Sequence, residues 1–301
     1  MCQTFRSYLF AAITILCLFL AMPGSSALAQ GGDAGDQDSL GVGVVLFGAG
    51  ADSADVENDK GRVSTATAGV VVSCPVSDLT YSATDYDWGD KTKLPFGNGS
   101  DDPWDVLHSL SLDLHHNEMV DDHWGYFLGG SVGAQWEIEL ADSGFLGLRG
   151  GGVYAFDKDV RLNFGLMGSV HKIGLRVFPA LSLAYRSAEV EGFSATVGAP
   201  ETWLRYRFDP AWLVRMGASL EGGTYRLEDE STVARKGYVD RFGVVLGAVA
   251  EWSPLQNLRV SFGPDFYLAR SLTVYDKDGD KKDSYSVDPA LGGSASVRWS
   301  F

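Results

Sequence analysis

Cysteine is nearly absent from this 301-residue chain, which holds three: Cys2, Cys17 and Cys74. The first two lie in an N-terminal segment that we predict to be removed, so only Cys74 remains and no intramolecular disulfide can form. Cys74 falls in step with Val70 and Val72, which indicates a small apolar side chain rather than a reactive thiol. The mature fold must therefore be held together without covalent cross-links.

Basic residues are also scarce. The chain has 24 Lys and Arg against 39 Asp and Glu, a formal net charge of −15. Loss of Arg6 with the N-terminal segment leaves 23 against 39, or −16. Binding to phosphate backbones requires a basic surface, so this balance excludes nucleic acid as a partner.

Long apolar runs are limited to one, Tyr8 to Met22. At roughly 15 residues it is shorter than the ~20 that a membrane-spanning helix needs. Arg6 precedes it and the small-residue site Ala27-Leu28-Ala29 follows, the order typical of a secretory signal peptide. We predict a signal peptide over residues 1–29 and a disordered periplasmic leader over residues 30–39, which is rich in Gly and Asp.

From residue 40 to residue 301 the chain repeats one unit, about ten alternating residues followed by a turn. In Trp124 to Trp136, the residues Trp124, Leu128, Val132 and Trp136 share one face. Comparable splits occur at Val160–Gly168, Leu175–Tyr185, Trp212–Leu220, Phe242–Trp252 and Leu258–Leu268. Helical spacing fits none of these segments better.

We predict an all-β fold, a closed antiparallel transmembrane β-barrel of fourteen strands, the first near Leu40–Ala51 and the last at Val287–Phe301. Twelve strands remain the alternative if Phe193–Val197 and Thr202–Phe208 do not form a hairpin that crosses the membrane. A soluble β-sandwich is the competing fold, but its large aromatic residues would more often lie in the middle of the strands.

Aromatic residues instead lie at the ends of the apolar faces, as at a lipid interface. The connections alternate in length: Ser253–Gln256 and Asp209–Ala211 are short, whereas Gly89–Asp102, Glu228–Gly237 and Asp276–Ser284 are long. Short periplasmic turns and longer outer loops are typical of barrels in the outer membrane of Gram-negative-type bacteria. We therefore expect outer-membrane lipid as the surrounding partner.

The last segment, Ser294 to Phe301, alternates strictly and ends on an aromatic residue. Its apolar face would meet lipid, and its edge must pair with the first strand because an open edge is intolerable in a membrane. Trp299 and Phe301 resemble the terminal assembly signal of bacterial outer-membrane barrels. That resemblance implies the barrel-assembly machinery as a partner during insertion.

A second resemblance covers roughly Leu40 to Phe301. It rests on Asp102-Pro-Trp-Asp-Val-Leu-His-Ser-Leu-Ser-Leu112, Gly150-Gly-Gly-Val-Tyr-Ala-Phe156, Arg205-Tyr-Arg-Phe208 and the terminal Phe301. In these stretches the chain resembles an uncharacterised family of bacterial outer-membrane β-barrels catalogued only as a domain of unknown function. The resemblance implies a barrel in the outer membrane and brings no activity or catalytic residue.

Candidate metal sites and catalytic groups are weak. The segment His115 to His123 collects imidazoles and carboxylates, but a polar turn between strands accounts for it. Asp276, Asp278 and Asp280 resemble a calcium loop, although the glycine is at the fourth position rather than the sixth. No His-x-Ser motif occurs, and the sequence does not place His108, Ser109 and His171 together. We expect no enzyme activity, no cofactor and no metal site, and leave calcium at the Asp276 turn open.

Lysine and arginine are sorted by position. All nine Lys fall in predicted turns or loops, whereas many Arg fall within strands, opposite the apolar face. Because charge facing lipid is costly, these Arg are predicted to face the lumen. They are Arg149, Arg161, Arg176, Arg186, Arg205, Arg207, Arg215, Arg241, Arg259 and Arg298.

Two functions fit this sorting. In one, the Arg line a pore through which small polar or anionic solutes diffuse passively. In the other, they pair with the inward acids Asp113, Glu137, Glu221, Glu251 and Asp265. The barrel would then be a non-conducting structural or interaction protein that presents acidic outer loops. Ten Arg against five acids favour the pore.

Overall fold

The computed structural model describes residues 42–186 and 191–301. The predicted signal peptide (1–29) and leader (30–39) lie outside these residues. The strands are β1 (Gly43–Asp55), β2 (Arg62–Cys74), β3 (Ser77–Gly89), β4 (Val106–Met119), β5 (Trp124–Trp136), β6 (Gly144–Ala155), β7 (Val160–His171), β8 (Gly174–Arg186), β9 (Gly192–Ala199), β10 (Glu201–Arg207), β11 (Trp212–Arg226), β12 (Tyr238–Leu255), β13 (Leu258–Tyr275), β14 (Lys281–Val287) and β15 (Ala290–Ser300). A short 3-10 helix, η2 (Lys91–Lys93), lies between β3 and β4.

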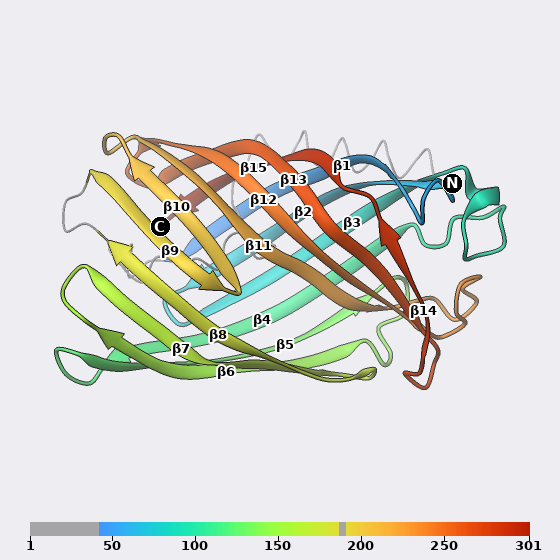
Figure 1. The fold of residues 1–301 in the computed structure, drawn as a ribbon, viewed down its shortest axis with the longest axis horizontal. Coiled ribbons are helices and arrows are strands. Elements are labelled where there is room, and N and C mark those ends of the chain that lie inside the picture. Colours follow the sequence, from blue (N-terminus) through green and yellow to red (C-terminus); the bar gives the residue numbers. More distant parts are fainter. Residues whose placement is uncertain (1–41, 187–190) are drawn as a thin grey trace.

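The strands form one closed antiparallel barrel (Figure 1). Each strand from β1 to β13 pairs with the next, and β15 closes the ring by pairing with both β13 and β1. β14 also pairs with β13, and its last residue, Val287, forms a bridge with Val56 just after β1. β14 therefore occupies the same wall position as β15, between β13 and β1. The fifteen strands thus fill fourteen wall positions. The predicted fourteen-stranded barrel is confirmed, and the hairpin β9–β10 belongs to its wall.

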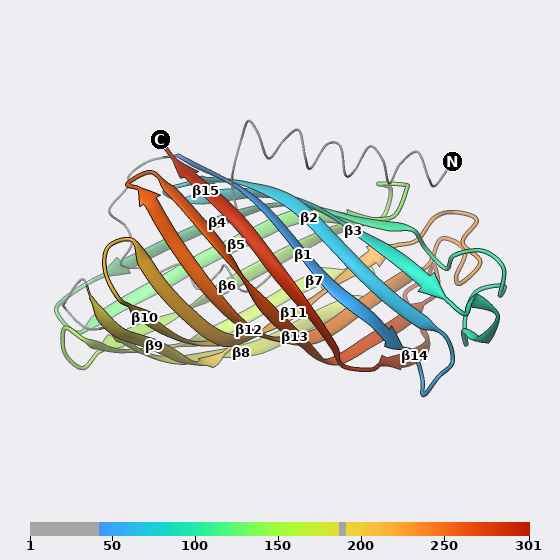
Figure 2. The same ribbon diagram turned by 90° about the horizontal axis from the view of Figure 1, so that it is seen from above.

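The two ends of the barrel differ, as predicted. At the end that we call the turn end, strands are joined by short connections such as residues 75–76 and 208–211. At the opposite loop end, residues 90–105 and 227–237 form the longest connections. Figure 2 shows β1 and β15 side by side, with the last residues of β15 at the turn end.

Three predicted boundaries are wrong. His115 to Met119 continue strand β4 instead of forming a turn. Pro254 and Leu255 extend β12, and Lys281 to Ser284 begin β14. In each case the strand extends beyond the segment with alternating apolar residues, because the strands of a barrel continue to pair outside the lipid. No helix in residues 42–186 and 191–301 is long and apolar enough to cross a membrane.

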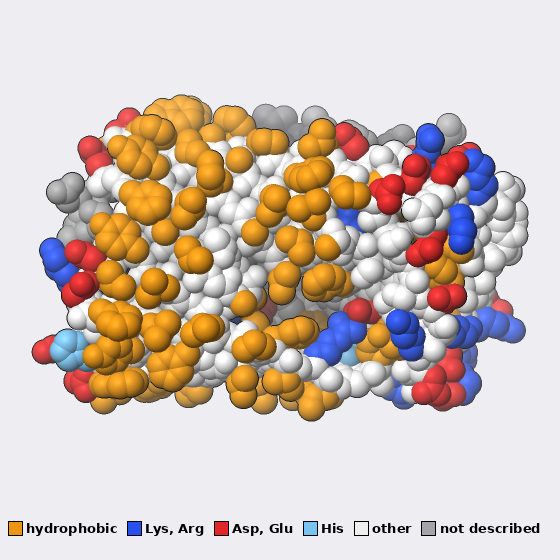
Figure 3. Space-filling model, in the orientation of Figure 1, with side chains coloured by type: hydrophobic (Ala, Val, Ile, Leu, Met, Phe, Trp, Pro, Cys, Tyr) orange, Lys and Arg blue, Asp and Glu red, His pale blue; other side chains and the backbone are white. Residues whose placement is uncertain are grey.

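The outer surface is apolar over most of the barrel. One side chain in two points outward, and the outward set includes exposed Leu79, Leu112, Leu128, Val132, Leu148, Leu166, Leu183, Leu204, Met216, Leu246 and Phe262. Figure 3 shows such side chains spread over the wall, with charged groups gathered most densely at the loop end. This is the surface of a membrane-spanning barrel, where lipid replaces the core as the apolar environment.

The interior is packed on one side only. Among the described residues, the main cluster of buried apolar side chains draws on β1–β4, β11–β15 and the two long loops, and on no residue of β5–β10. We call β11–β15 with β1–β4 the packed half and β5–β10 the open half. In the open half inward residues remain partly exposed, and the inward Phe178 of β8 is 47% exposed.

The wall is incomplete beside the hairpin β9–β10, whose strands have 8 and 7 residues. β8 pairs with β9 only from Leu181 onward, and β11 pairs with β10 only up to Ser219. Toward the loop end, β11 instead touches β5, through a bridge from Arg226 to Trp136. The loop ends of β11 and β12 therefore curl inward, beneath β5–β8.

Candidate functional site

An arginine cluster lines the turn-end part of the lumen on four strands of the barrel, β10, β11, β13 and β15. Arg205 lies directly opposite Arg215, and Arg259 lies directly opposite Arg298. Arg205 interacts electrostatically with Arg207, Arg215, Arg259 and Glu251. We call Arg205, Arg207, Arg215, Arg259 and Arg298 the lumen arginine cluster. Like charges directly opposite each other in a sheet are destabilising, so this arrangement is a cost to the fold.

Two acids approach the cluster. Glu251 Oε1 lies 3.2 Å from Arg259 Nε, and the buried Asp265 interacts with Arg215. Several members of the cluster also have further polar contacts. Among the described residues, five guanidinium groups thus gather beside these two carboxylates.

The other predicted pore-lining residues lie elsewhere. Arg149 of β6 lies over Gly129, and Arg161 and Arg186 lie near the turn end of β7 and β8. Arg176 forms an ion pair with Asp240 of β12 at 2.8 Å. Arg241 lies 5.4 Å from the ring centre of Tyr86. All ten Arg are in strands, as predicted, but they do not form one continuous stripe.

Sequence reasoning missed Arg226 and Arg270. Arg270 of β13 lies 5.9 Å from the ring centre of Tyr267 and interacts with Glu221. Arg226 is buried and bonds to Leu227 O and Asp229. Both residues lie beyond the apolar alternation of their strands, where β11 and β13 extend into the loop end, so the pattern gave no signal for either.

An aromatic plug fills the loop end of the packed half. Tyr86 and Trp88 point inward from β3, while Phe96 and Trp104 descend from the loop 90–105. The rings of Trp88 and Trp104 meet edge to face at 5.0 Å, and those of Phe96 and Trp104 are stacked at 5.7 Å. Trp88 Nε1 donates to Trp104 O at 2.9 Å. A solute moving along the barrel axis therefore meets packed side chains at this end.

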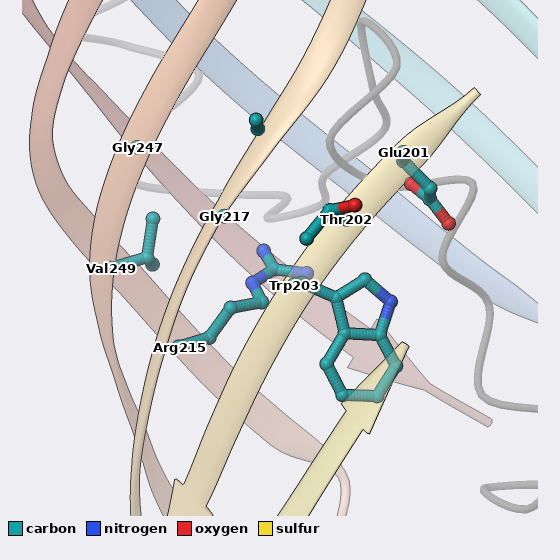
Figure 4. Close-up of a pocket in the computed structure, with 8 residues that line it drawn as sticks. Glu201, Thr202, Trp203, Arg215, Gly217, Gly247 and Val249 are labelled. Atoms are coloured by element: carbon teal, nitrogen blue, oxygen red, sulfur yellow. The ribbon is translucent and has the colours of Figure 1, made fainter. Parts of the chain in front are cut away.

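Two small cavities flank the lumen. One lies beside the plug and is lined by Tyr86, Glu221, Arg241 and Arg270 among others. The second lies at the tip of the hairpin β9–β10, where Trp203 and Arg215 line it (Figure 4). Figure 4 shows Arg215 extending from β11 toward Trp203 on β10. Trp203 packs on Gly217, whose missing side chain leaves room for it.

The overlap at the loop end is fastened by polar contacts between β5–β8 and β11–β12. Thr224 N donates to Gln135 Oε1, Glu137 N donates to Arg226 O, and Glu228 N donates to Glu137 Oε2, each at 2.9 Å. Burial raises the pKa of Glu137 to about 7, and the Glu228 N–H only partly opposes this. Glu137 was predicted to be an inward acid of the lumen, and this prediction is wrong, because the residue lies in the loop after β5.

The candidate metal ligands do not converge. His115 faces Asp78 at 3.7 Å, whereas His116 faces Glu118 at 3.3 Å. Asp276 Oδ1 accepts the backbone N–H groups of Asp278 and Asp280, which closes a tight turn and lowers the pKa of Asp276. Within the ranges that the structure covers, no three His, Cys, Asp or Glu side chains gather as metal ligands.

At the turn end, Phe301 N donates to Val42 O at 2.9 Å, so the terminal residue continues the ladder between β15 and β1. This pairing is the closure that the alternating last segment predicts. The role of Trp299 and Phe301 as an assembly signal stays a prediction.

No family model matches the chain, and neither does any curated protein. Solved structures of other barrels are similar in fold. An outer-membrane channel from Pseudomonas putida F1 has a TM-score of 0.42 at 10% identity, over 89% of this chain and 99% of that one. The OprB protein of Pseudomonas putida has 0.35 at 10%, over 94% and 100%. The porin NanC has 0.38 at 10%, over 86% and 100%.

At these low scores and identities the similarities assign no function to this chain. The resemblance to the uncharacterised family also stays a prediction. The structure itself establishes a closed, fourteen-position, membrane-type β-barrel.

Proposed function

We propose that the protein is an outer-membrane channel through which small anionic solutes diffuse passively. The turn end would face the periplasm and the loop end the outside, as in other bacterial barrels. The observation that carries the proposal is the lumen arginine cluster. Two pairs of Arg lie directly opposite each other on the inner face, where an anion in transit would meet both pairs.

The guanidinium groups keep their charge at any working pH, so the selectivity would be fixed rather than gated by pH. The acidic surplus of the whole chain does not contradict it, because many of the acids lie in the loops outside the lumen. A ring of one sign selects ions of the other sign where the passage is narrow. The aromatic plug keeps the passage narrow at the loop end.

The test is the reversal potential of the reconstituted protein in a salt gradient across a planar bilayer. We expect anion selectivity in the wild type and a weaker one in the double variant Arg205→Ser, Arg207→Ser. The matched control is Arg235→Ser with Lys236→Ser, which removes the same charge from the exposed loop 227–237. Cation selectivity in the wild type contradicts the proposal.

The aromatic plug favours a second candidate, a non-conducting structural or interaction barrel. In that candidate the rings would close the loop end of the packed half, and the overlap of β11–β12 with β5–β8 would close the rest. In that case the arginine cluster would serve as part of a paired-charge network, and no single-channel steps would appear.

A further inference from the structure

The wall of the barrel has an opening bounded on all sides by described residues. On one side is the edge of β8 from Val177 to Ala180, and on the other is the edge of β11 from Leu220 to Gly223; neither pairs with a strand of the hairpin β9–β10. No ladder joins β8 to β11 in the described part of the chain. We call this opening the side window.

The two remaining borders are built by specific contacts. Toward the turn end the window stops at the hairpin tip, where Ala199 and Pro200 join β9 to β10. Toward the loop end it stops at Asp240, whose Oδ1 accepts from Arg176 Nη1 at 2.8 Å and from Thr224 Oγ1 at 2.7 Å. The window is therefore a limited gap in the wall, closed by the hairpin tip toward the turn end and by the Asp240 contacts toward the loop end.

Some backbone groups on the strand edges at the window have hydrogen-bond partners although no neighbouring strand is present. Thr224 N, which would otherwise donate to a strand at the missing position, donates to the side chain of Gln135. Gly222 and Gly223 lie on the same edge. A Cβ on Gly222 would come within 2.4 Å of Arg241 O of β12, and one on Gly223 would come within 2.6 Å of the Gln135 side chain, so neither position has room for a larger residue.

The window lies within the apolar band of the exterior. Its outer rim carries Val177 and Leu220, with exposures of 56% and 38%. Figure 3 shows this face of the barrel hollowed between the apolar side chains of the two parts of the wall. Lipid, rather than water, therefore lies in front of the opening.

Behind the window the lumen is apolar first and cationic further in. Phe178 points inward and is 47% exposed, with Met167 opposite it on β7. On β10 the inward residues run from Glu201 at the tip through Trp203 to Arg205. At ~3.3 Å per residue, Arg205 lies about 13 Å from the tip. Glu201 has a polar contact of its own, and Figure 4 shows its side chain directed away from Arg215.

We infer that the side window admits amphipathic anions from the bilayer, molecules with an alkyl or aryl body and one sulfonate, carboxylate or phosphate group. The body would pass the apolar rim and lie along Phe178 and Trp203, while the head reaches the lumen arginine cluster. The substrate class rests on the proposed function of that cluster, whereas the window itself does not. A lateral route also bypasses the aromatic plug.

The first experiment measures access to the inner face of β8. Nitroxide labels are attached to Phe178→Cys and to Ser131→Cys, each with Cys74→Ser, in phosphatidylcholine vesicles. Both positions face inward, but Ser131 lies on β5, which is paired on both sides. Val177→Cys calibrates direct lipid contact.

We expect the label at 178 to collide with oxygen dissolved in the lipid more, relative to a water-soluble nickel chelate, than the label at 131 does. Equal ratios at 178 and 131 would overturn the window.

The second experiment separates the window from the arginine cluster. Binding of decanesulfonate, supplied in the vesicle membrane, and of methanesulfonate, supplied in water, is measured for the wild type and three variants. Ala180→Trp fills the inner side of the window, Leu148→Trp adds the same ring to the intact wall of β6, and Arg205→Ser with Arg215→Ser removes charge from the cluster.

We expect Ala180→Trp to lose decanesulfonate and keep methanesulfonate, and the Arg variant to lose both. Leu148→Trp should bind as the wild type. Unchanged decanesulfonate binding by Ala180→Trp overturns lateral entry. If Ala180→Trp loses decanesulfonate while the Arg variant keeps both ligands, the window stands and the proposed anion function fails.

Discussion

The two halves of this barrel share one exterior and have different interiors. In the packed half, β1–β4 and β11–β15 direct aromatic and aliphatic residues into a cluster at the loop end. In the open half, β5–β10 contribute nothing to that cluster, and Phe178 remains 47% exposed on the inside. Both present Leu, Val and Phe to the lipid. The lipid therefore sets the outward pattern everywhere, whereas the inward residues distinguish a stabilising region from a passage.

The largest expected effect comes from removing one ring from the aromatic plug. Trp104 is 1% exposed and contacts Tyr86, Trp88 and Phe96. Trp104→Ala should cost about 3–5 kcal/mol of unfolding free energy, as large aromatic deletions in cores do, and should raise single-channel conductance. Denaturant unfolding in vesicles and bilayer recordings measure the two effects. The control is Trp124→Ala on the outside of β5, where the side chain is 51% exposed; equal losses at both sites would contradict the contrast.

Charge placed on the exterior should affect the two halves alike. Val297→Arg in β15 and Val132→Arg in β5 both meet lipid and should each cost roughly 2–4 kcal/mol if they lie near the bilayer centre. Ser296→Arg, whose side chain faces inward beside Ser261, should cost much less. Equilibrium unfolding checks all three variants. A small cost at either Val would place that part of the wall outside the lipid.

The contact between Arg176 and Asp240 fastens the open half to the packed half, and its effect should be moderate. A double-mutant cycle with Arg176→Gln and Asp240→Asn should give a coupling of about 1 kcal/mol. The exposed pair Arg235 and Glu230, with exposures of 69% and 74%, should give close to zero in the same assay. Similar couplings for both pairs would mean that the fastening has no special strength.

The smallest effect is a pH dependence at the same seam. Because burial raises the pKa of Glu137 from 4.5 to about 7, its contribution to stability is complete below pH 4.5 and is lost as pH rises through about 7. Hydrogen exchange at the Glu228 amide, which donates to Glu137, should speed up over that range beyond the intrinsic rise. Glu137→Gln keeps an acceptor and should abolish the extra change. A dependence that persists in this variant points to another group.

Much of the fold could be predicted from the sequence because residues that face lipid and residues that face the lumen alternate along each strand of a barrel. Alternation in Trp124–Trp136 identified β5 with its observed bounds, whereas the same pattern left the hairpin β9–β10 open between the wall of a fourteen-stranded barrel and a twelve-stranded alternative. The ten Arg were assigned to strands for the same local reason, since charge on the outward face is costly in lipid.

The site depends on contacts that no periodicity encodes. Trp104 and Phe96 belong to a loop, and only the closed barrel places them against Trp88 of β3. The sequence showed that β9 and β10 are short, but only the register of the ladders shows that β8 and β11 are left unpaired beyond them. Likewise Arg176 and Asp240 are 64 residues apart in the chain. Alternation decides which way a side chain points, whereas ring closure and curvature decide which side chains it meets.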